Sequence, residues 1–539
     1  MNAKCHIWAA LVGLIGRIVF GADIHFDDPS FGGGLQSGAH IVLEPGEYHF
    51  GPESVQRICL NPSNNASGEK NVAFCMRGLS NVEIDGQGST FVFHDGVFPF
   101  AAIGCTNIAI RNIVALTDRP PYVSFVVGRK DDDGFEIALE NAFSDLPLVG
   151  KHLCFHSLDR NFQDYYISPS DPESRDWVPT KYISGDVERK DVRRYYFRYH
   201  PESHKSYSRC RFAEGERVCL NLAGNREQIF FFAQDCKNVT LESVKLPLFG
   251  GMGIVAQRTE DIIIKRYVVL PDAEKGLPVT LTADAMHFIN CGGKIRIEDC
   301  EVAETLDDVC NVHGNYLKVL STQRRAVALE VGHFEQAGFF PCRDGDEVEF
   351  IHPATRDVVA RRRVVAFRPQ SDKKALIEVD GELGDLPSGC LVEDVTLCPD
   401  VEIRNNYFHD FPHMRLSGRG KMIVEGNRIE RCEDGLLALD LADYWYESGR
   451  IEDLTIRSNT FYRCSSFHSK GPYIRIGLNG DERDDLGAPK IHGRIRLIGN
   501  TYPELEGAPF KVCGVRDFTG DCLKMAGEEQ IENEIGEKQ

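Results

Sequence analysis

The chain has 539 residues, of which 42% are hydrophobic, and a formal net charge of −20 at pH 7. This hydrophobic content is ordinary for a globular protein and excludes a disordered chain. The negative charge argues against nucleic-acid binding, for which a basic stripe is expected, and disfavours polyanionic ligands unless lysines and arginines cluster locally. A neutral glycan is an easier partner. The length exceeds one compact domain, although repeat proteins depart from that rule because each repeat contacts only its neighbours.

The first 22 residues have the pattern of an export signal. Lys4 supplies a positive start, residues 7–15 form an apolar run, and residues 19–22 end in a small-residue cleavage site. The run is too short to span a bilayer comfortably, and no later segment has the length and apolarity of a membrane helix. We expect export to the periplasm or the cell exterior. A buried N-terminal strand or helix is the alternative interpretation, since Arg17 interrupts the pattern.

A short motif of alternating apolar residues followed by a turn returns along the chain. Its copies begin at Asn81, Asn107, Asn238, Asp261, Lys294, Asp400, Lys421, Asp453 and Arg494. In the last four copies an asparagine falls five residues after the first apolar position, at Asn406, Asn427, Asn459 and Asn500. We expect these asparagines to stack on successive turns and hydrogen-bond to one another. Repeats of this length with one strand-like element per unit are typical of a solenoid.

The apolar alternation in these copies has a period of two rather than 3.6, which excludes helical repeats. The sequence therefore predicts an all-β fold, a right-handed parallel β-helix in which each coil buries its inner face on its neighbours. A β-sandwich built from similar strands is the alternative. Two stretches, 117–230 and 316–398, break the period, and the second carries short alternating strands with turn signals at Asp344-Gly and Asp380-Gly. Each stretch is long enough for an inserted β-barrel-like domain.

These breaks divide the chain into seven segments. We expect a signal peptide (1–22), an N-terminal part of the β-helix (23–116), a first insertion (117–230), a central part of the β-helix (231–315), a second insertion (316–398), a C-terminal part of the β-helix (399–524) and an acidic tail (525–539). The tail is rich in Glu and reads as a solvated end. The most informative residues lie in the central part.

Three carboxylates fall in two short apolar segments of this central part. Asp284 opens Asp-Ala-Met-His-Phe, and Asp307 and Asp308 lie in Leu-Asp-Asp-Val-Cys-Asn-Val-His-Gly. Asp308 follows Asp284 by 24 residues, so a coil of that length stacks the two with Asp307 beside them. Like charges that close raise at least one pKa, and neighbouring carboxylates with separated pKa values form an acid and a base. This is the equipment of a glycosidase. A calcium site or turn caps are the alternatives.

The spacing from successive strand starts extends this stack to further coils. It places five residues at equivalent positions: Gly251, Asp284, Asp308, His413 and Asp434. We interpret Gly250, Gly251 and Gly253 as small residues that leave room for a ligand beside the acids. His287 and His313 are either core histidines or sugar contacts.

Aromatic residues and cysteines give weaker signals. Trp445, with Tyr444 and Tyr446, is either a sugar-stacking platform or an ordinary aromatic cluster. The chain has 18 cysteines, an odd number remains once Cys5 leaves with the signal, and this does not indicate a disulfide scaffold. No CxxC pair or HExxH motif appears, so we expect no structural zinc and no zinc protease site.

The motif from Asp284 through Cys291-Gly-Gly-Lys-Ile-Arg-Ile-Glu-Asp-Cys to His313 resembles the catalytic region of glycoside hydrolase family 110. Members of that family are exo-acting α-1,3-galactosidases that remove terminal galactose from glycans such as the blood group B antigen. The resemblance extends to the layout of signal peptide, parallel β-helix and two inserted β-barrels. It implies an inverting enzyme that uses no metal or other cofactor. It leaves open whether branched or linear α-1,3-galactose is preferred, and whether the enzyme is a homodimer.

The resemblance also implies roles for residues. Asp284, Asp307 and Asp308 match the family's active-site aspartates, and Glu335 is the candidate for its further glutamate, with Glu347 as the alternative. The substrate-binding candidates are His287, Asn311, His313, His413 and Asp434.

In an inverting enzyme one carboxyl protonates the glycosidic oxygen while a carboxylate about 6.5–9.5 Å away activates water. We expect Asp284 and Asp308 to share that water and Asp307 to be the general acid, although exchanged roles fit the sequence equally.

Three other functions fit a β-helix. A polysaccharide lyase needs a basic proton abstractor and usually calcium, and no Lys or Arg falls at the stacked position. The acids also resemble those of the family 28 polygalacturonases, which act on a charged polymer. A non-catalytic glycan-binding β-helix, such as an adhesin or tailspike, gives no reason to stack carboxylates. We therefore favour the glycosidase.

Overall fold

The computed structural model describes strand β1 (Arg17–Phe20) and residues 35–520, with gaps at 95, 141–145, 147–152, 158–165, 168–174, 177–179, 184, 200–212, 222–227, 443, 465–471 and 479–489. Nearly every described element is a strand, and the three short 3-10 helices are η1 (Pro52–Ser54), η2 (Ala273–Lys275) and η3 (Phe334–Gln336). Within these residues no helix is long and apolar enough to cross a membrane. The predicted acidic tail lies outside the described residues.

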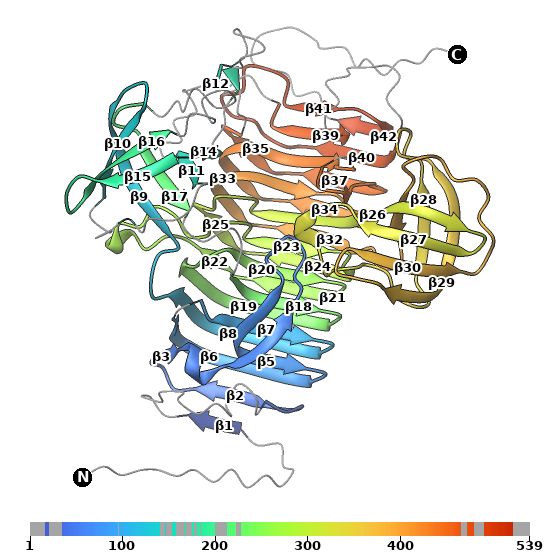
Figure 1. The fold of residues 1–539 in the computed structure, drawn as a ribbon, viewed down its shortest axis with the longest axis horizontal. Coiled ribbons are helices and arrows are strands. Elements are labelled where there is room, and N and C mark those ends of the chain that lie inside the picture. The colour runs from blue at the N-terminus through green and yellow to red at the C-terminus, as the bar shows by residue number, and fades with distance from the viewer. Residues whose placement is uncertain are drawn as a thin grey trace.

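The strands stack as coils of a parallel β-helix, from β1 at one end to β42 at the other (Figure 1). The first of three parallel ladders runs through β1, β2 (His40–Leu43), β6 (Ser80–Phe93), β8 (Thr106–Thr117), β19 (Lys237–Leu248), β21 (Glu260–Lys265), β24 (Gly292–Glu298), β32 (Asp400–Arg404), β34 (Lys421–Glu425), β37 (Asp453–Arg457), β40 (His492–Ile498) and β42 (Val515–Gly520). β1 falls in the predicted export signal, whose remaining residues lie outside the described ones, so export stays a prediction.

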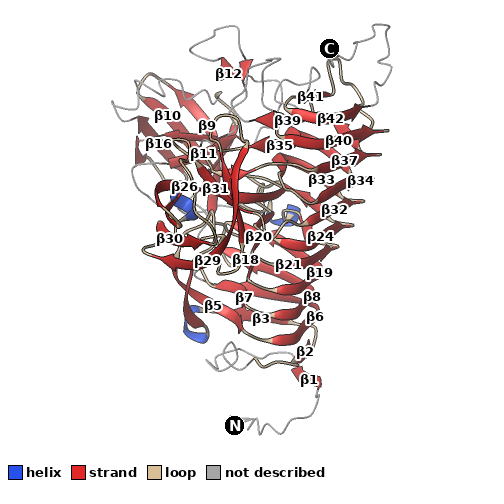
Figure 2. Ribbon diagram, turned by 90° about the vertical axis from the view of Figure 1, so that its right-hand side faces the viewer, coloured by secondary structure: helices blue, strands red, loops and turns tan. Residues whose placement is uncertain are grey.

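The second ladder begins at β3 (Glu47–Phe50) and continues through the second halves of β6, β8 and β19. It then passes through β22 (Val268–Val269), β25 (Glu301–Ala303), β33 (Tyr407–Leu416), β35 (Arg428–Asp440) and β38 (Thr460–Tyr462). Long strands such as β6 and β8 therefore bend from one ladder into the next. Figure 2 shows these coils in side view, with their strands stacked from β1 at the bottom to β42 near the top.

The third ladder carries the segments that the sequence analysis singled out. It runs through β5 (Gly68–Arg77), β7 (Phe98–Ile103), β18 (Ile229–Gln234), β20 (Met252–Gln257), β23 (Met286–Ile289), β26 (Cys310–Gln323), the ends of β33 and β35, β39 (Ile474–Leu478) and β41 (Phe510–Val512). Two short antiparallel partners border it, β4 (Gln56–Leu60) on β5 and β36 (Glu447–Ser448) on β26.

A buried ladder of asparagines stabilises the C-terminal coils, as the sequence predicts. The side-chain nitrogen of Asn406 donates to Asn427, that of Asn427 to Asn459, and that of Asn459 to Asn500, over 2.9, 2.9 and 3.0 Å. All four side chains are buried. Each nitrogen also donates to a backbone oxygen, for example Asn427 to Ile403. The ladder satisfies polar groups at each turn, and an apolar core runs the length of the β-helix inside it.

The first insertion leaves the β-helix after β8 and returns at β18. Its seven-stranded antiparallel sheet has the order β14-β11-β17-β9-β10-β16-β15. These strands are β9 (Tyr122–Lys130), β10 (Gly134–Leu139), β11 (Leu153–Ser157), β14 (Thr180–Ile183), β15 (Gly185–Arg189), β16 (Arg194–Tyr199) and β17 (Arg217–Asn221), with β12 (Tyr166–Ile167) and β13 (Arg175–Asp176) forming a separate pair. The sheet and the β-helix share an apolar cluster through Leu248, Leu277, Val279 and Leu306.

The second insertion is a closed antiparallel barrel on the other side of the β-helix (Figure 1). Its ring is β26-β27-β30-β29-β28-β31 and back to β26. The new strands are β27 (Ala326–Val331), β28 (Glu347–Ile351), β29 (Val358–Pro369), β30 (Lys374–Val379) and β31 (Leu391–Asp394). Because β26 belongs first to the β-helix and then to the barrel, the barrel begins directly after the segment that carries the clustered acids.

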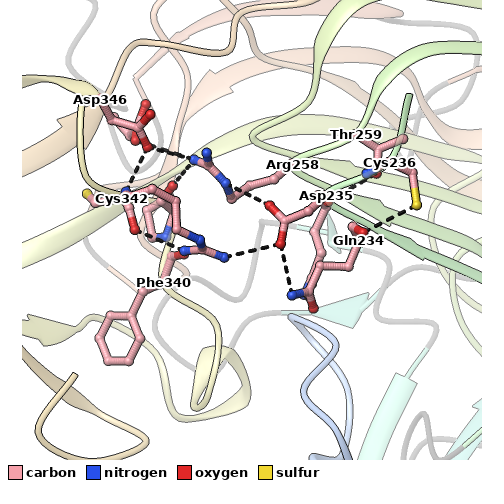
Figure 3. A network of polar contacts seen from close by, with 12 residues as sticks. Gln234, Asp235, Cys236, Arg258, Thr259, Phe340, Cys342 and Asp346 are labelled. Carbon is pink, nitrogen blue, oxygen red and sulfur yellow. Dashed lines mark hydrogen bonds and ion pairs between the residues drawn. The ribbon is translucent and has the colours of Figure 1, made fainter. Parts of the chain in front are cut away.

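Buried ion pairs join this barrel to the β-helix. Arg258, at the turn after β20, lies between Asp235 of the β-helix and Asp346 of the barrel (Figure 3). Its Nε is 3.1 Å from Asp235, and its Nη1 is 2.9 Å from Asp346 and 3.6 Å from Asp394. Arg419 contacts Glu349 at 2.7 Å and also pairs with Glu393. These contacts fix the barrel beside the third ladder.

The predicted fold is confirmed: the chain is an all-β protein, a parallel β-helix with two inserted β-domains. The cysteines whose side chains the structure describes are free, and most of them are buried, where a small and weakly polar side chain packs well.

Candidate active site

Asp284, Asp307 and Asp308 converge at one end of the third ladder. Asp284 lies in the turn before β23 and Asp308 in the matching turn before β26. The pairing of His287 with Asn311 sets these coils 24 residues apart, and the amide of Ala285 donates to the backbone oxygen of Asp308 over 2.9 Å. One carboxylate oxygen from each aspartate lies within 4.8 Å of the others. Asp284 and Asp308 are buried, whereas Asp307 is half-buried. We call these three residues the aspartate trio.

This separation is shorter than the about 6.5–9.5 Å expected of an inverting acid and base. The side-chain oxygen Oδ1 of Asp307 accepts from the backbone amide of Asp308 over 3.1 Å, which turns its carboxylate back over the neighbouring residue. The expected spacing is therefore not found within the trio.

An arginine faces the trio. Nε of Arg415, from the end of β33, lies 3.0 Å from Oδ2 of Asp308. Burial raises the pKa of Asp308 well above its ordinary value; Arg415 opposes this shift, while Asp307 and Asp284 add to it. Three carboxylates beside a guanidinium repel one another, which disfavours the ionised form of at least one of them. Such an arrangement can supply both an acid and a base.

The substrate-binding candidates His287 and His313 lie in the interior. His287 contacts Asp284 through Nδ1, and its Nε2 lies 2.8 Å from Nε2 of His313. Asn311 pairs with His287 on the next coil and is also buried. Neither histidine side chain is more than 1% exposed, so these rings pack behind the trio as core residues.

His413 and Asp434, the other two candidates, form a second charged group on adjacent coils. Their strands pair residue for residue, and Nδ1 of His413 lies 3.3 Å from Oδ2 of Asp434 while its Nε2 lies 3.4 Å from Glu433. Burial alone would lower the pKa of His413, but Glu433 and Asp434 raise it to about 9. Burial raises the pKa of Glu433 to about 7, against the effect of His413. This group joins the trio through Arg415, whose pKa is raised by Asp308 and Asp434 despite burial.

Two details of the predicted stack are corrected by the observed register. Ile254 pairs with Met286, which puts Met252 rather than Gly251 opposite Asp284. Cys310 pairs with Met414, which puts Val309 rather than Asp308 opposite His413. The pairing of His413 with Asp434 is as predicted. Positions in the third ladder that are predicted from the strand starts of the first ladder are wrong by one residue, because turns of different length connect the two ladders.

The three glycines near Asp284 also do not open space for a ligand. A Cβ on Gly251 would lie 2.2 Å from the backbone oxygen of Gln228, and one on Gly253 would lie 2.4 Å from that of Ala285. At Gly250 it would meet the Gln228 side chain at 2.4 Å. Gly250 and Gly251 instead allow close packing against Gln228, where the chain leaves the first insertion, and Gly253 allows the turn before β23 to approach closely.

Glu335 and Glu347 have different surroundings. Glu335 lies in η3, where its backbone oxygen accepts from the amide of Asn64 over 2.9 Å. The side chain of Asn64 in turn donates to Glu447, which lies 3.6 Å from His313. Glu347 lies on β28 of the barrel and forms an exposed ion pair with Arg361. The link from Glu335 runs through its backbone oxygen, so the choice between the two side chains stays a prediction.

Sequence reasoning missed four residues of this region. Arg415 follows His413 by two positions on β33, so period-two alternation could have placed both on one face. Glu433 directly precedes Asp434, but only Asp434 was chosen as a candidate site residue. Glu447 comes from the short strand β36, and Asn64 from the loop before β5. No local pattern marks the last two, because they are brought together from positions 383 residues apart.

Aromatic side chains surround η3. The ring centroid of His333 lies 4.4 Å from those of Phe334 and Trp445 and 5.1 Å from that of Tyr444, with the rings tilted against one another. Phe334 is 66% and Tyr444 60% exposed. The Gln336 side chain donates to the backbone oxygen of Trp445 over 2.7 Å, which ties this cluster to the barrel.

Two groups of side chains in the described residues have the composition of a metal site. One is the aspartate trio, and the other is His287, His313 and Glu447. The Nε2 atoms of the two histidines are 2.8 Å apart, the length of a hydrogen bond, whereas nitrogens on one tetrahedral zinc are roughly 3.3 Å apart. The second group is therefore connected by a shared proton.

Comparisons with known proteins agree with this architecture. The family model described as GLAA-B beta-barrel domain II matches residues 326–395, the second insertion. The α-1,3-galactosidase A of Bacteroides fragilis is 27% identical over 490 residues, which cover 87% of this chain and 78% of that protein. The α-1,3-galactosidase A of Streptomyces avermitilis is 26% identical over 523 residues, covering 90% and 81%.

Solved β-helix structures are more distant. The mannuronan C-5 epimerase module of Azotobacter vinelandii covers 90% of this chain and 87% of its own, at 10% identity and a TM-score of 0.29, too low to support an argument. The comparison therefore rests on the curated relatives. Across most of its length, this chain is a homologue of curated α-1,3-galactosidases, as its resemblance to glycoside hydrolase family 110 implied.

Proposed function

We propose that this chain is an exo-acting glycosidase that hydrolyses terminal α-1,3-linked galactose, with the aspartate trio as its acid and base. The trio carries this proposal, because it gathers two buried carboxylates and one half-buried carboxylate, and burial raises the pKa of Asp308, in a homologue of α-1,3-galactosidases. The glycosidase is favoured over a lyase, because the cation at the trio is an arginine paired with Asp308 rather than a free base.

In this mechanism one carboxyl of the trio protonates the glycosidic oxygen, and a carboxylate activates the attacking water. Asp307 is the member nearest solvent and is our candidate for the acid, with Asp284 and Asp308 holding the water. Arg415 keeps Oδ2 of Asp308 in place. We assign contacts with the glycan to Glu335 and the aromatic residues around η3.

The stereochemistry is a separate point. The resemblance implies inversion, whereas carboxyl groups about 5–5.5 Å apart are typical of retaining enzymes. The trio is at the shorter spacing. We propose inversion, with water held beside the trio rather than between two distant carboxyls, and the anomer of the first product decides the question.

The test is galactose release by the purified chain from two glycans, a fucosylated B-type trisaccharide and linear Galα1-3Gal, followed by NMR with and without a chelator. We expect β-galactose first and no effect of the chelator, and the two rates define the linkage range. Release of α-galactose first would show retention. Release from neither glycan would refute the galactosidase, and an unsaturated uronate from a polyuronate would establish a lyase.

We also propose that the chain is exported, on the pattern of residues 1–22. N-terminal sequencing of the protein recovered from its native host tests this. A start after the predicted cleavage site would support it, and an intact Met1 would overturn it.

A further inference from the structure

A chain of hydrogen bonds leads from Asp284 into the protein interior. Asp284 contacts Nδ1 of His287, whose Nε2 lies 2.8 Å from Nε2 of His313. Nδ1 of His313 lies 2.8 Å from the backbone oxygen of Gly314. Both rings are buried, and they meet edge to face at an interplanar angle of 84°. The chain thus ends on a fixed carbonyl of β26.

That carbonyl decides where the protons are. A carbonyl oxygen only accepts, so His313 carries a proton on Nδ1. Burial lowers the pKa of His313, with Glu447 opposing the shift, which keeps the ring neutral and leaves its Nε2 as an acceptor. His287 must therefore donate from Nε2. Its Nδ1 and the Asp284 carboxyl then share one further proton, because neither two lone pairs nor two protons fit that contact.

The shared proton belongs mainly to His287. An imidazole is ordinarily more basic than a carboxylate, with pKa values of about 6.5 and about 3.9. Glu447, a buried carboxylate 3.6 Å from Nε2 of His313, adds negative charge on the far side of the pair. Asp284 is therefore the member of the trio that is held as a carboxylate by a cation on its own coil.

We propose that His287 and His313 are positioning residues that hold a proton against Asp284, and so make Asp284 the general base of the trio. This rests on the proposed glycosidase function and deepens it. It leaves the acid role to Asp307 or Asp308. Compared with a second arginine, the imidazole has a further effect: it fixes the orientation of the Asp284 carboxylate through a series of hydrogen bonds that ends on the backbone.

The charged groups around this pair come from four elements. Asp284 faces His287 from the turn before β23, and Glu447 faces His313 from β36. Asp308, before β26, and Arg415, on β33, act on Asp284 and Glu447 from the neighbouring coils. The carboxylates outnumber the single guanidinium, which favours a protonated imidazole between them.

The first test reads the protons directly and needs no substrate. The full chain is labelled with 15N-histidine, and the ring nitrogens are followed by long-range proton–nitrogen NMR, with His287→Asn and His313→Gln variants to assign two of its 17 histidines. We expect His313 neutral with its proton on Nδ1, and His287 protonated on both nitrogens at pH 7. A His287 ring with an unprotonated Nδ1 would overturn the proposal, whether or not the protein releases galactose.

The second test is the pH profile of kcat/KM, whose acidic limb reports ionisation of the base in the free enzyme. His287→Asn keeps an N–H toward Asp284 but loses the charge, so the limb moves to higher pH by about 1–3 units, the usual effect of an opposite charge at this range. His313→Gln retains an acceptor for His287 and keeps the wild-type limb, whereas His313→Leu moves it in the same direction as His287→Asn.

His492→Asn is the matched control. His492 is a buried histidine of the C-terminal coils, with Nε2 3.0 Å from the backbone oxygen of Gly477 and Nδ1 accepting from Ile451 over 3.3 Å. Its replacement lowers stability but leaves the acidic limb unchanged. If the acidic limb of the pH profile moved in neither His287→Asn nor His313→Leu, the two histidines would only pack in the core, and the proposal would be overturned.

Discussion

Two groups of buried acids in this molecule differ in the cations that face them. At the junction with the barrel, Asp346 and Asp394 face the guanidinium of Arg258, and backbone amides of Arg343 and Thr396 add further donors. In the aspartate trio, Asp308 faces Arg415, but Asp284 faces an imidazole and Asp307 is half-buried. A guanidinium cannot release its proton, whereas an imidazole and a carboxyl can. The first group joins two domains, and the second is suited to move protons.

Replacing Asp308 by Asn should give the largest effect on catalysis. General acid–base groups contribute about 10²–10⁴-fold, so we expect kcat to fall by at least about a hundredfold. The fold should persist, because an amide has the shape of the carboxyl group and its oxygen can still accept from Nε of Arg415. Galactose release and thermal unfolding, measured on one preparation, check both statements. Full activity at unchanged stability would remove Asp308 from the site.

Replacing Arg258 by Met should have the opposite pattern, a loss of stability rather than of catalysis. Breaking a buried ion pair by removing one partner costs about 3–5 kcal/mol of unfolding free energy, because Asp346 stays buried without its cation. Arg361→Met is the matched control, since its pair with Glu347 is exposed and is worth no more than about 1 kcal/mol. Denaturant unfolding of both variants tests the contrast. Equal losses would show that the junction does not depend on Arg258.

Much of this architecture could be predicted from local sequence. The period-two alternation with Asn at fixed offsets indicated the β-helix, and the 24-residue spacing brought Asp284 and Asp308 together. Arg415 and Glu433 lie next to predicted residues and could have been found. Glu447 and Asn64 could not, because only the path of the loops brings them together. The one-residue errors in the stack have the same origin, since turn lengths between ladders leave no trace in strand patterns.

The junction acids should also give stability a pH dependence. Burial, and after it the neighbouring Asp346, raises the pKa of Asp394 from 3.8 to about 8. The folded protein therefore binds more protons than the unfolded chain between about pH 4 and pH 8, so this group's contribution to the unfolding free energy falls as pH rises through that range. Asp394→Asn should flatten this fall and gain relative to the wild type at pH 8. Parallel curves for the two proteins would show that Asp394 is ionised in the fold.

The asparagine ladder gives the smallest effect and separates structure from catalysis. Asn427→Ala leaves the side-chain oxygen of Asn459 and the amide of Asn406 buried with fewer partners, which costs about 1–3 kcal/mol. Asn238→Gly is the comparison, because Asn238 makes a similar 2.8 Å bond to Asn107 but is exposed, and glycine accepts its φ of 56°. It should lose no more than about 1 kcal/mol. Both variants should keep the wild-type kcat and its pH profile, since neither touches the trio or its histidines. Asn427 lies just before β35, the strand that carries Glu433 and Asp434. If the pH profile shifted in Asn427→Ala but not in Asn238→Gly, the backbone of the C-terminal coils would be shown to affect the charges of the site.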